Sequence, residues 1–110
     1  MRSKVSPYSE IVPQELGGGV TRRVLAWLPE QMMVEVSFKQ SAIGTEHTHP
    51  HTQCTFVLEG EFDFTVDGRV YRVRRGDTLA FASGERHGCI CVEKGKLLDV
   101  FTPMREDFLK

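Results

Sequence analysis

The stretch HTHPHTQCTFVLEG, residues 47–60, places three imidazoles directly before an apolar segment. The whole chain has only four histidines, so the presence of three of them in this stretch indicates a chemical role. On a β-strand, side chains two residues apart point to the same face, so His47 and His49 project together with Cα atoms about 6.6 Å apart. Two imidazoles placed in this way can bind neighbouring positions of one metal ion. The stretch therefore predicts part of a metal site.

Pro50 divides this stretch into two strands. A proline cannot donate to a central β-ladder, so one strand is expected to end there and Gln53 to open the next. On a straight strand Gln53 would lie about 20 Å from His47, too far to share an ion, and the break removes this difficulty. His51 falls in the turn between the two strands, and its role stays open.

The segments on both sides of this stretch alternate between apolar and polar residues, which is the period of a half-buried strand. Asp67 and Gly68 form a strong hairpin signal, because both central positions of a type I′ turn need a positive φ. Turn signals recur about every eight to twelve residues, which favours an all-β sandwich or barrel. PMREDFLK, residues 103–110, predicts a short C-terminal helix. Strands are expected at residues 32–38, 56–66, 70–73, 78–82, 87–92 and 97–101.

At 110 residues the chain is long enough for one domain with its own core and too short for two. We predict an irregular segment at residues 1–19 and a single folded domain at residues 20–110. The formal net charge of −1 gives no reason to expect a nucleic-acid partner. Arg72, Arg74 and Arg75 form the only basic cluster, which we interpret as a solvated strand end.

No apolar run approaches the roughly 18 residues that a membrane span needs. The first ten residues, MRSKVSPYSE, lack the apolar stretch of a secretory signal. Three cysteines without a CxxC spacing indicate free thiols in a reducing compartment. We therefore expect a cytoplasmic protein that binds neither membranes nor nucleic acids.

Two spaced motifs resemble those of the cupin family. The first is the opening stretch, with His47, His49, Gln53 in place of an acid, and Gly60 in register. The second is GDTLAFASGERHGCIC, residues 76–91, which contributes His87 as a further ligand. In that second motif Gly76 and Gly84 match the family pattern, whereas Ala82 stands for its proline and Cys91 for its asparagine.

This resemblance implies a small single-domain jelly-roll barrel (a double-stranded β-helix) that holds one divalent transition metal ion. The implied metal ligands are His47, His49, Gln53 and His87. Two departures stand out, because Gln53 replaces a carboxylate and Ser41 replaces a glycine. With a neutral amide ligand the ion would keep its full charge and attract anions. These ligands suit Ni, Fe, Mn, Co and Zn alike.

The C-terminal stretch LLDVFTPMREDFLK, residues 97–110, suggests the substrate side of such a site. Asp99 and Phe101 share one strand face, and an aspartate that faces a barrel interior near a cation is a candidate general acid or base. Arg105 has the two-pronged fork that holds a carboxylate. Taken without the family, Asp99 could equally pair with a surface arginine, and Arg105 could lie on an exposed helix.

HTHPHTQ, VLEGEFDFTVDG (residues 57–68) and DVFTPMREDFL (residues 99–109) together resemble the pectin-degradation cupins (KdgF). This likeness runs from about Val20 to Lys110. It implies metal-dependent conversion of 4,5-unsaturated monouronates, released from pectin or alginate, to the linear keto-uronate 4-deoxy-5-hexosulose uronate. It also implies that Asp99 and Arg105 are catalytic and that Phe101 and Arg105 bind the substrate.

Other activities fit the metal ligands alone. One is an iron-dependent cupin dioxygenase, and another is a metal- or sugar-binding cupin without enzymatic activity. A barrel with a vestigial metal site is a third. We expect the small-molecule uronate to be the main partner, and a homodimer formed through edge strands, since two-fold dimers are common.

Overall fold

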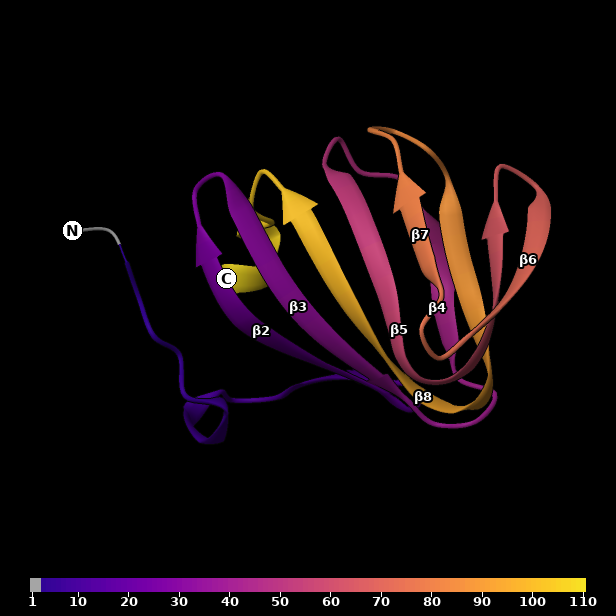
Figure 1. The fold of residues 1–110 in the computed structure, drawn as a ribbon, viewed down its shortest axis with the longest axis horizontal. Coiled ribbons are helices and arrows are strands. Elements are labelled where there is room, and N and C mark those ends of the chain that lie inside the picture. The colour runs from indigo at the N-terminus through magenta and orange to yellow at the C-terminus, as the bar shows by residue number, and fades with distance from the viewer. Residues whose placement is uncertain (1–2) are drawn as a thin grey trace.

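The computed structural model describes residues 3–110, which form a roll of antiparallel strands (Figure 1). The strand order is β1-β2-β3-β8-β5-β6, with β4 on β8 and β7 on β5. This confirms the expected all-β cupin architecture. The strands are β1 (Gln14–Gly17), β2 (Val20–Leu28), β3 (Gln31–Phe38), β4 (Ile43–His47), β5 (Thr52–Val66), β6 (Arg69–Arg74), β7 (Thr78–Phe81) and β8 (His87–Thr102).

The two long strands β5 and β8 form the spine of the roll. They pair with each other along most of their length and bend together, so that each contributes to both sides (Figure 1). The first half of β8 pairs with β4 and the second half with β3. This bend brings the His87 end of β8 and its Asp99 end to the walls of one interior.

Gly60 sits at the bend, where the β5–β8 register shifts. Its φ is +82°, and a Cβ there would collide with the backbone carbonyls of Glu93 and Lys94. A glycine is therefore required for both the dihedral angle and the close approach. Ser41, which stands where the family pattern has glycine, also adopts a positive φ of 70°.

The interior follows the alternation of the strands. On β3, Met32, Val34 and Phe38 are buried, as their common parity predicts. Phe38 packs edge-on against Phe62 with ring centroids 5.2 Å apart. A smaller cluster holds Met32, Val34 and Phe101, and the other buried apolar residues form the main core cluster. Its buried members are Val20, Phe38, Ala42, Val57, Phe62, Phe64, Val73, Phe81, Cys89, Cys91 and Leu97.

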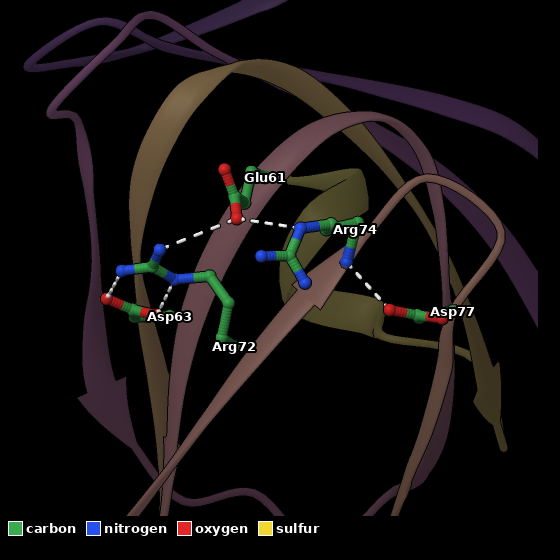
Figure 2. Close-up of polar contacts among 5 residues, drawn as sticks. All are labelled: Glu61, Asp63, Arg72, Arg74 and Asp77. Atoms are coloured by element: carbon green, nitrogen blue, oxygen red, sulfur yellow. Dashed lines mark hydrogen bonds and ion pairs between the residues drawn. The ribbon is translucent and has the colours of Figure 1, made fainter.

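The β5–β6 hairpin carries the basic cluster. Asp67 and Gly68 take φ values of 46° and 84°, which confirms the expected turn. Arg72 makes a two-pronged contact with Asp63, which lowers the pKa of that carboxyl through its hydrogen bonds. Arg72 and Arg74 also share Glu61 (Figure 2). The charges of these arginines are thus balanced on the surface by carboxylates of the neighbouring strand.

The two chain ends differ in detail from the expectation. Residues 3–19 include a 3₁₀ turn, η1 (Tyr8–Glu10), and the short edge strand β1. The C-terminal helix is one 3₁₀ turn, η2 (Glu106–Leu109). The boundary at residue 20 stays a prediction. All three cysteines are free thiols, as expected. No helix within residues 3–110 is long and apolar enough to cross a membrane.

Candidate metal centre and pocket

Three imidazoles converge in the roll interior. His47 ends β4, His49 lies in the following loop, and His87 opens β8 as the register partner of His47. The ring centroid of His87 lies 4.7 Å from that of His47 and 5.0 Å from that of His49. One ligand nitrogen from each ring lies within 4.8 Å of the other two. The sheet register thus brings together the two histidine segments that are distant in sequence.

Each of the three rings is oriented by a backbone carbonyl. Nδ1 of His47, His49 and His87 lies 2.7, 3.1 and 2.9 Å from the carbonyl oxygens of Thr45, His51 and Glu85. A carbonyl only accepts, so each Nδ1 carries the proton and each Nε2 offers a lone pair. Such contacts are the usual way in which proteins orient metal-binding histidines.

His87 is held as a neutral ring. It is buried and stacks on Phe81 with centroids 4.2 Å apart. Burial lowers the pKa of His87 to about 4 and also lowers the pKa of His49. Lowered pKa values favour the neutral form of both rings, with the proton on Nδ1. Nε2 of His87 is buried and has no hydrogen-bond partner within residues 3–110, which a bound cation would correct.

Gln53 meets His49 in a way that also fits a cation. Its Oε1 lies 2.9 Å from Nε2 of His49, while its Nε2 donates to Oγ1 of Thr55. Nδ1 of His49 already donates to a carbonyl, so a neutral His49 has no proton for Gln53. Two lone pairs then face each other, and a metal ion between them would make the contact favourable. The four side chains fit one divalent transition metal ion.

A buried hydrogen-bond chain links this centre to Asp99. Oγ1 of Thr55 accepts from Gln53 and donates to Oδ1 of Asp99 at 2.7 Å. Burial raises the pKa of Asp99 to about 6, although hydrogen bonds from Thr55 and Gln53 and the charge of Arg105 act in the opposite direction. Asp99 can therefore take up or release a proton near neutral pH. Sequence reasoning missed Thr55, whose parity with Gln53 on β5 was the available signal.

Arg105 and Phe101 line the same cavity, and the Phe101 ring packs beside His49. The Arg105 side chain is only 12% exposed, and its guanidinium carbon lies 5.1 Å from the Phe101 ring centre. Its Nε and one terminal nitrogen donate to Asp107 at 3.1 and 2.9 Å. The expected C-terminal helix is thus a short turn that follows Arg105 and folds back over the pocket. The pairing of Arg105 with Asp107 was not predicted from the sequence.

The cavity has a volume of about 360 Å³, the size of a small-molecule pocket. Its polar wall comes from β4, β5 and β8 and the C-terminal turn. The expected site residues on this wall are His47, Gln53, His87, Asp99, Phe101 and Arg105. His49 and His51 are not on this wall. Nε2 of His49 lies against Oε1 of Gln53, and Nε2 of His51 contacts the carbonyl oxygen of Met104 at 3.1 Å.

Comparison with known proteins gives consistent results. The family model described as Cupin domain matches residues 34–101. The pectin degradation protein KdgF of Dickeya dadantii (strain 3937) is 39% identical over 98 residues, which cover 87% of this chain and 89% of that protein.

Two solved structures share the fold over nearly their whole length. An RmlC-like cupin from Shewanella frigidimarina is 36% identical with a TM-score of 0.92, and the match covers 96% of each chain. KdgF from Halomonas sp. is 30% identical with a TM-score of 0.91, and the match covers 96% of this chain and 98% of that one.

Proposed function

The chain belongs to the cupin family, and from this premise we propose that it is a metal-dependent enzyme of uronate breakdown. Its reaction would convert 4,5-unsaturated monouronates, from pectin or alginate, to the linear keto-uronate 4-deoxy-5-hexosulose uronate. The similarity to KdgF supports the pathway. The observation that carries the proposal is one cavity lined by two members of the three-histidine centre, His47 and His87, and by a buried carboxyl and an arginine.

The four neutral ligands His47, His49, Gln53 and His87 would hold one divalent ion. When bound, the ion supplies Lewis acidity toward a substrate oxygen. The backbone carbonyls behind the imidazoles keep each Nε2 aimed at the centre. Because no ligand carries a negative charge, the site retains a strong attraction for an anionic sugar.

Asp99 would move the proton. In ring opening, the anomeric hydroxyl loses its proton as the C1–O5 bond breaks, and O5 keeps the electron pair of that bond and gains a proton. The resulting enol becomes a ketone when C4 gains a proton and O5 loses one. The substrate and product are isomers, so protons are relayed without net gain or loss. A carboxyl with a pKa of about 6 is suited to this exchange near neutral pH.

Arg105 and Phe101 would position the sugar. The guanidinium of Arg105 offers hydrogen bonds to the uronate carboxylate, and Phe101 offers an apolar face to the ring. Phe101 is itself fixed against His49, with ring centroids 5.7 Å apart. The sugar would thus be held between the metal ligands and the C-terminal turn.

The test is the ultraviolet absorbance of the unsaturated uronate, which ring opening and ketone formation remove. Purified metal-loaded protein should abolish this absorbance, and a chelator should prevent the loss. Oxygen uptake measured in the same cuvette separates the alternatives. Uptake coupled to product would indicate the dioxygenase, and binding of the sugar without any turnover would indicate a non-enzymatic cupin.

A further inference from the structure

A second arginine lines the cavity and has no part in the reaction described above. Arg22 lies on β2, and its guanidinium carbon is 3.8 Å from the ring centre of Phe108. The guanidinium carbon of Arg105 lies 4.2 Å from the same ring. The C-terminal turn runs beside β2 (Figure 1) and brings the two cations together at the pocket.

A hydrogen bond at Nε holds one edge of the Arg22 guanidinium. Its Nε donates to Oε1 of Gln14 at 2.8 Å, and Nε2 of Gln14 donates to the carbonyl of Phe108 at 3.2 Å. Gln14 on β1 therefore ties β2 to the C-terminal turn. Within residues 3–110, the terminal nitrogens of Arg22 have no carboxylate in ion-pair contact.

The charge balance of the pocket depends on this residue. Arg105 is already paired with Asp107 through two hydrogen bonds, so that pair is nearly neutral. Arg22 is half-buried and adds a second positive charge, and the charge of Asp107 acts on it as well, so the two guanidinium groups share one carboxylate. Two partly desolvated guanidinium groups with one carboxylate between them leave one positive charge unbalanced, which is unfavourable unless a ligand supplies a second negative charge. The charge that would complete the group is a single carboxylate.

We propose that Arg22 binds the substrate carboxylate together with Arg105 and makes the pocket selective for acidic over neutral sugars. This inference rests on the proposed function for the identity of the reactive sugar. One carboxylate has two oxygens and can accept hydrogen bonds from two guanidinium groups. Asp107 then acts as the partner that keeps Arg105 in place, while Arg22 supplies the net attraction.

The kinetic test compares Arg22→Gln with Arg23→Gln. The two residues are adjacent on β2, but Arg23 faces away from the cavity, 3.7 Å from Glu35 and over the ring of Tyr8. Arg22→Gln should raise KM for the unsaturated uronate about tenfold, the size of one partly exposed charged hydrogen bond, and leave kcat nearly unchanged. Arg23→Gln should leave KM unchanged. Equal KM values for Arg22→Gln and the unsubstituted protein would overturn the inference while the proposed reaction stands.

A binding test keeps the inference independent of turnover. Titration calorimetry of the metal-loaded protein with glucuronate and with glucose should show preference for glucuronate, and Arg22→Gln should lose most of that preference. Arg22→Lys, which keeps the charge without the planar fork, should retain part of it. These results without any turnover would reject the reaction and keep the inference. Equal affinity of the unsubstituted protein for the two sugars would reject the inference.

Discussion

Burial of the Asp99 carboxyl reduces the stability of the fold at neutral pH but provides a group suited to proton transfer. Its carboxyl is buried, and burial raises its pKa to about 6. The folded protein thus holds this proton more tightly than the unfolded chain. Below about pH 4 the Asp99 carboxyl is protonated and does not reduce stability. As the pH rises through its folded-state pKa, its ionisation lowers the free energy of unfolding. A shift of this size corresponds to at most about 3 kcal/mol at pH 7.

We therefore expect Asp99→Asn to stabilise the metal-free protein at pH 7 by about 1–3 kcal/mol, because a neutral amide replaces a buried charge. The gain should nearly vanish at pH 4, where the native carboxyl is protonated. Turnover should fall at least about 100-fold with loss of the proton carrier. Urea unfolding at both pH values measures the first effect.

Asp63→Asn is the matched control, since the pKa of Asp63 is lowered by Arg72 and its removal should give no gain at pH 7. A stability change for Asp99→Asn that is equal at pH 4 and pH 7 would contradict the assignment of its cost to ionisation.

His47 is the most accessible of the three converging imidazoles, so its replacement should leave the fold intact. His47→Ala is expected to lose both bound metal and activity. His51→Ala is the control, because the His51 ring packs beside His49 but offers no nitrogen to the converging group, and its Nε2 contacts the carbonyl of Met104. Elemental analysis provides the readout. Full metal content in His47→Ala would remove His47 from the ligand set.

Arg105 is expected to act mainly in substrate binding. Arg105→Ala should raise KM for the uronate by roughly 10- to 100-fold, since a charged hydrogen bond to carboxylate is lost. Steady-state kinetics with a charged and an esterified substrate would measure this. An unchanged KM for the charged substrate would rule out the carboxylate contact.

At the scale of elements, the shared bend of β5 and β8 decides where the site forms. Gly60 permits the bend, because its dihedral angle and the nearby carbonyls leave no room for a Cβ. On one side of the bend β8 presents His87, and on the other it presents Asp99. A straight β8 would separate these two residues by about 40 Å.

Gly60→Ala should lower the free energy of unfolding by about 3 kcal/mol or more, through the left-handed dihedral angle and the collision together. Gly68→Ala isolates the first cause, because Gly68 has a φ of 84° and a Cβ added there would meet nothing within 4 Å. It should cost about 1 kcal/mol. Chemical denaturation compares the two, and equal costs would show that the close approach at Gly60 contributes nothing.

At the scale of the whole molecule, metal binding should couple to folding. When the free metal concentration is 100 times Kd, removal of the metal lowers the free energy of unfolding by about 2.7 kcal/mol. In a domain of this size this loss lowers Tm on the order of 10 °C. Calorimetric melting with and without a chelator measures this, and added metal should restore Tm. His47→Ala should show no chelator effect. An unchanged Tm of the unsubstituted protein would contradict a resident ion. The expected homodimer stays a prediction.

The sequence by itself determined the local features of this protein. Strand alternation, the Asp67–Gly68 turn and the break near Pro50 all depend on neighbours in the chain, whose geometry is nearly independent of the rest of the fold. The expected strand face shared by His47 and His49 did not form, because β4 ends at His47 and His49 lies in the loop. The likeness to cupins added His87 and the C-terminal residues.

Only the tertiary structure decided which distant segments meet. The Thr55 link to Asp99 depends on the β5–β8 register, and the approach of Arg22 to Arg105 depends on β1 and the C-terminal turn packing together. Asp107 pairs with Arg105 because the expected helix is a tight turn. Such contacts are set by packing and by the register of strands far apart in sequence, and no local pattern encodes them.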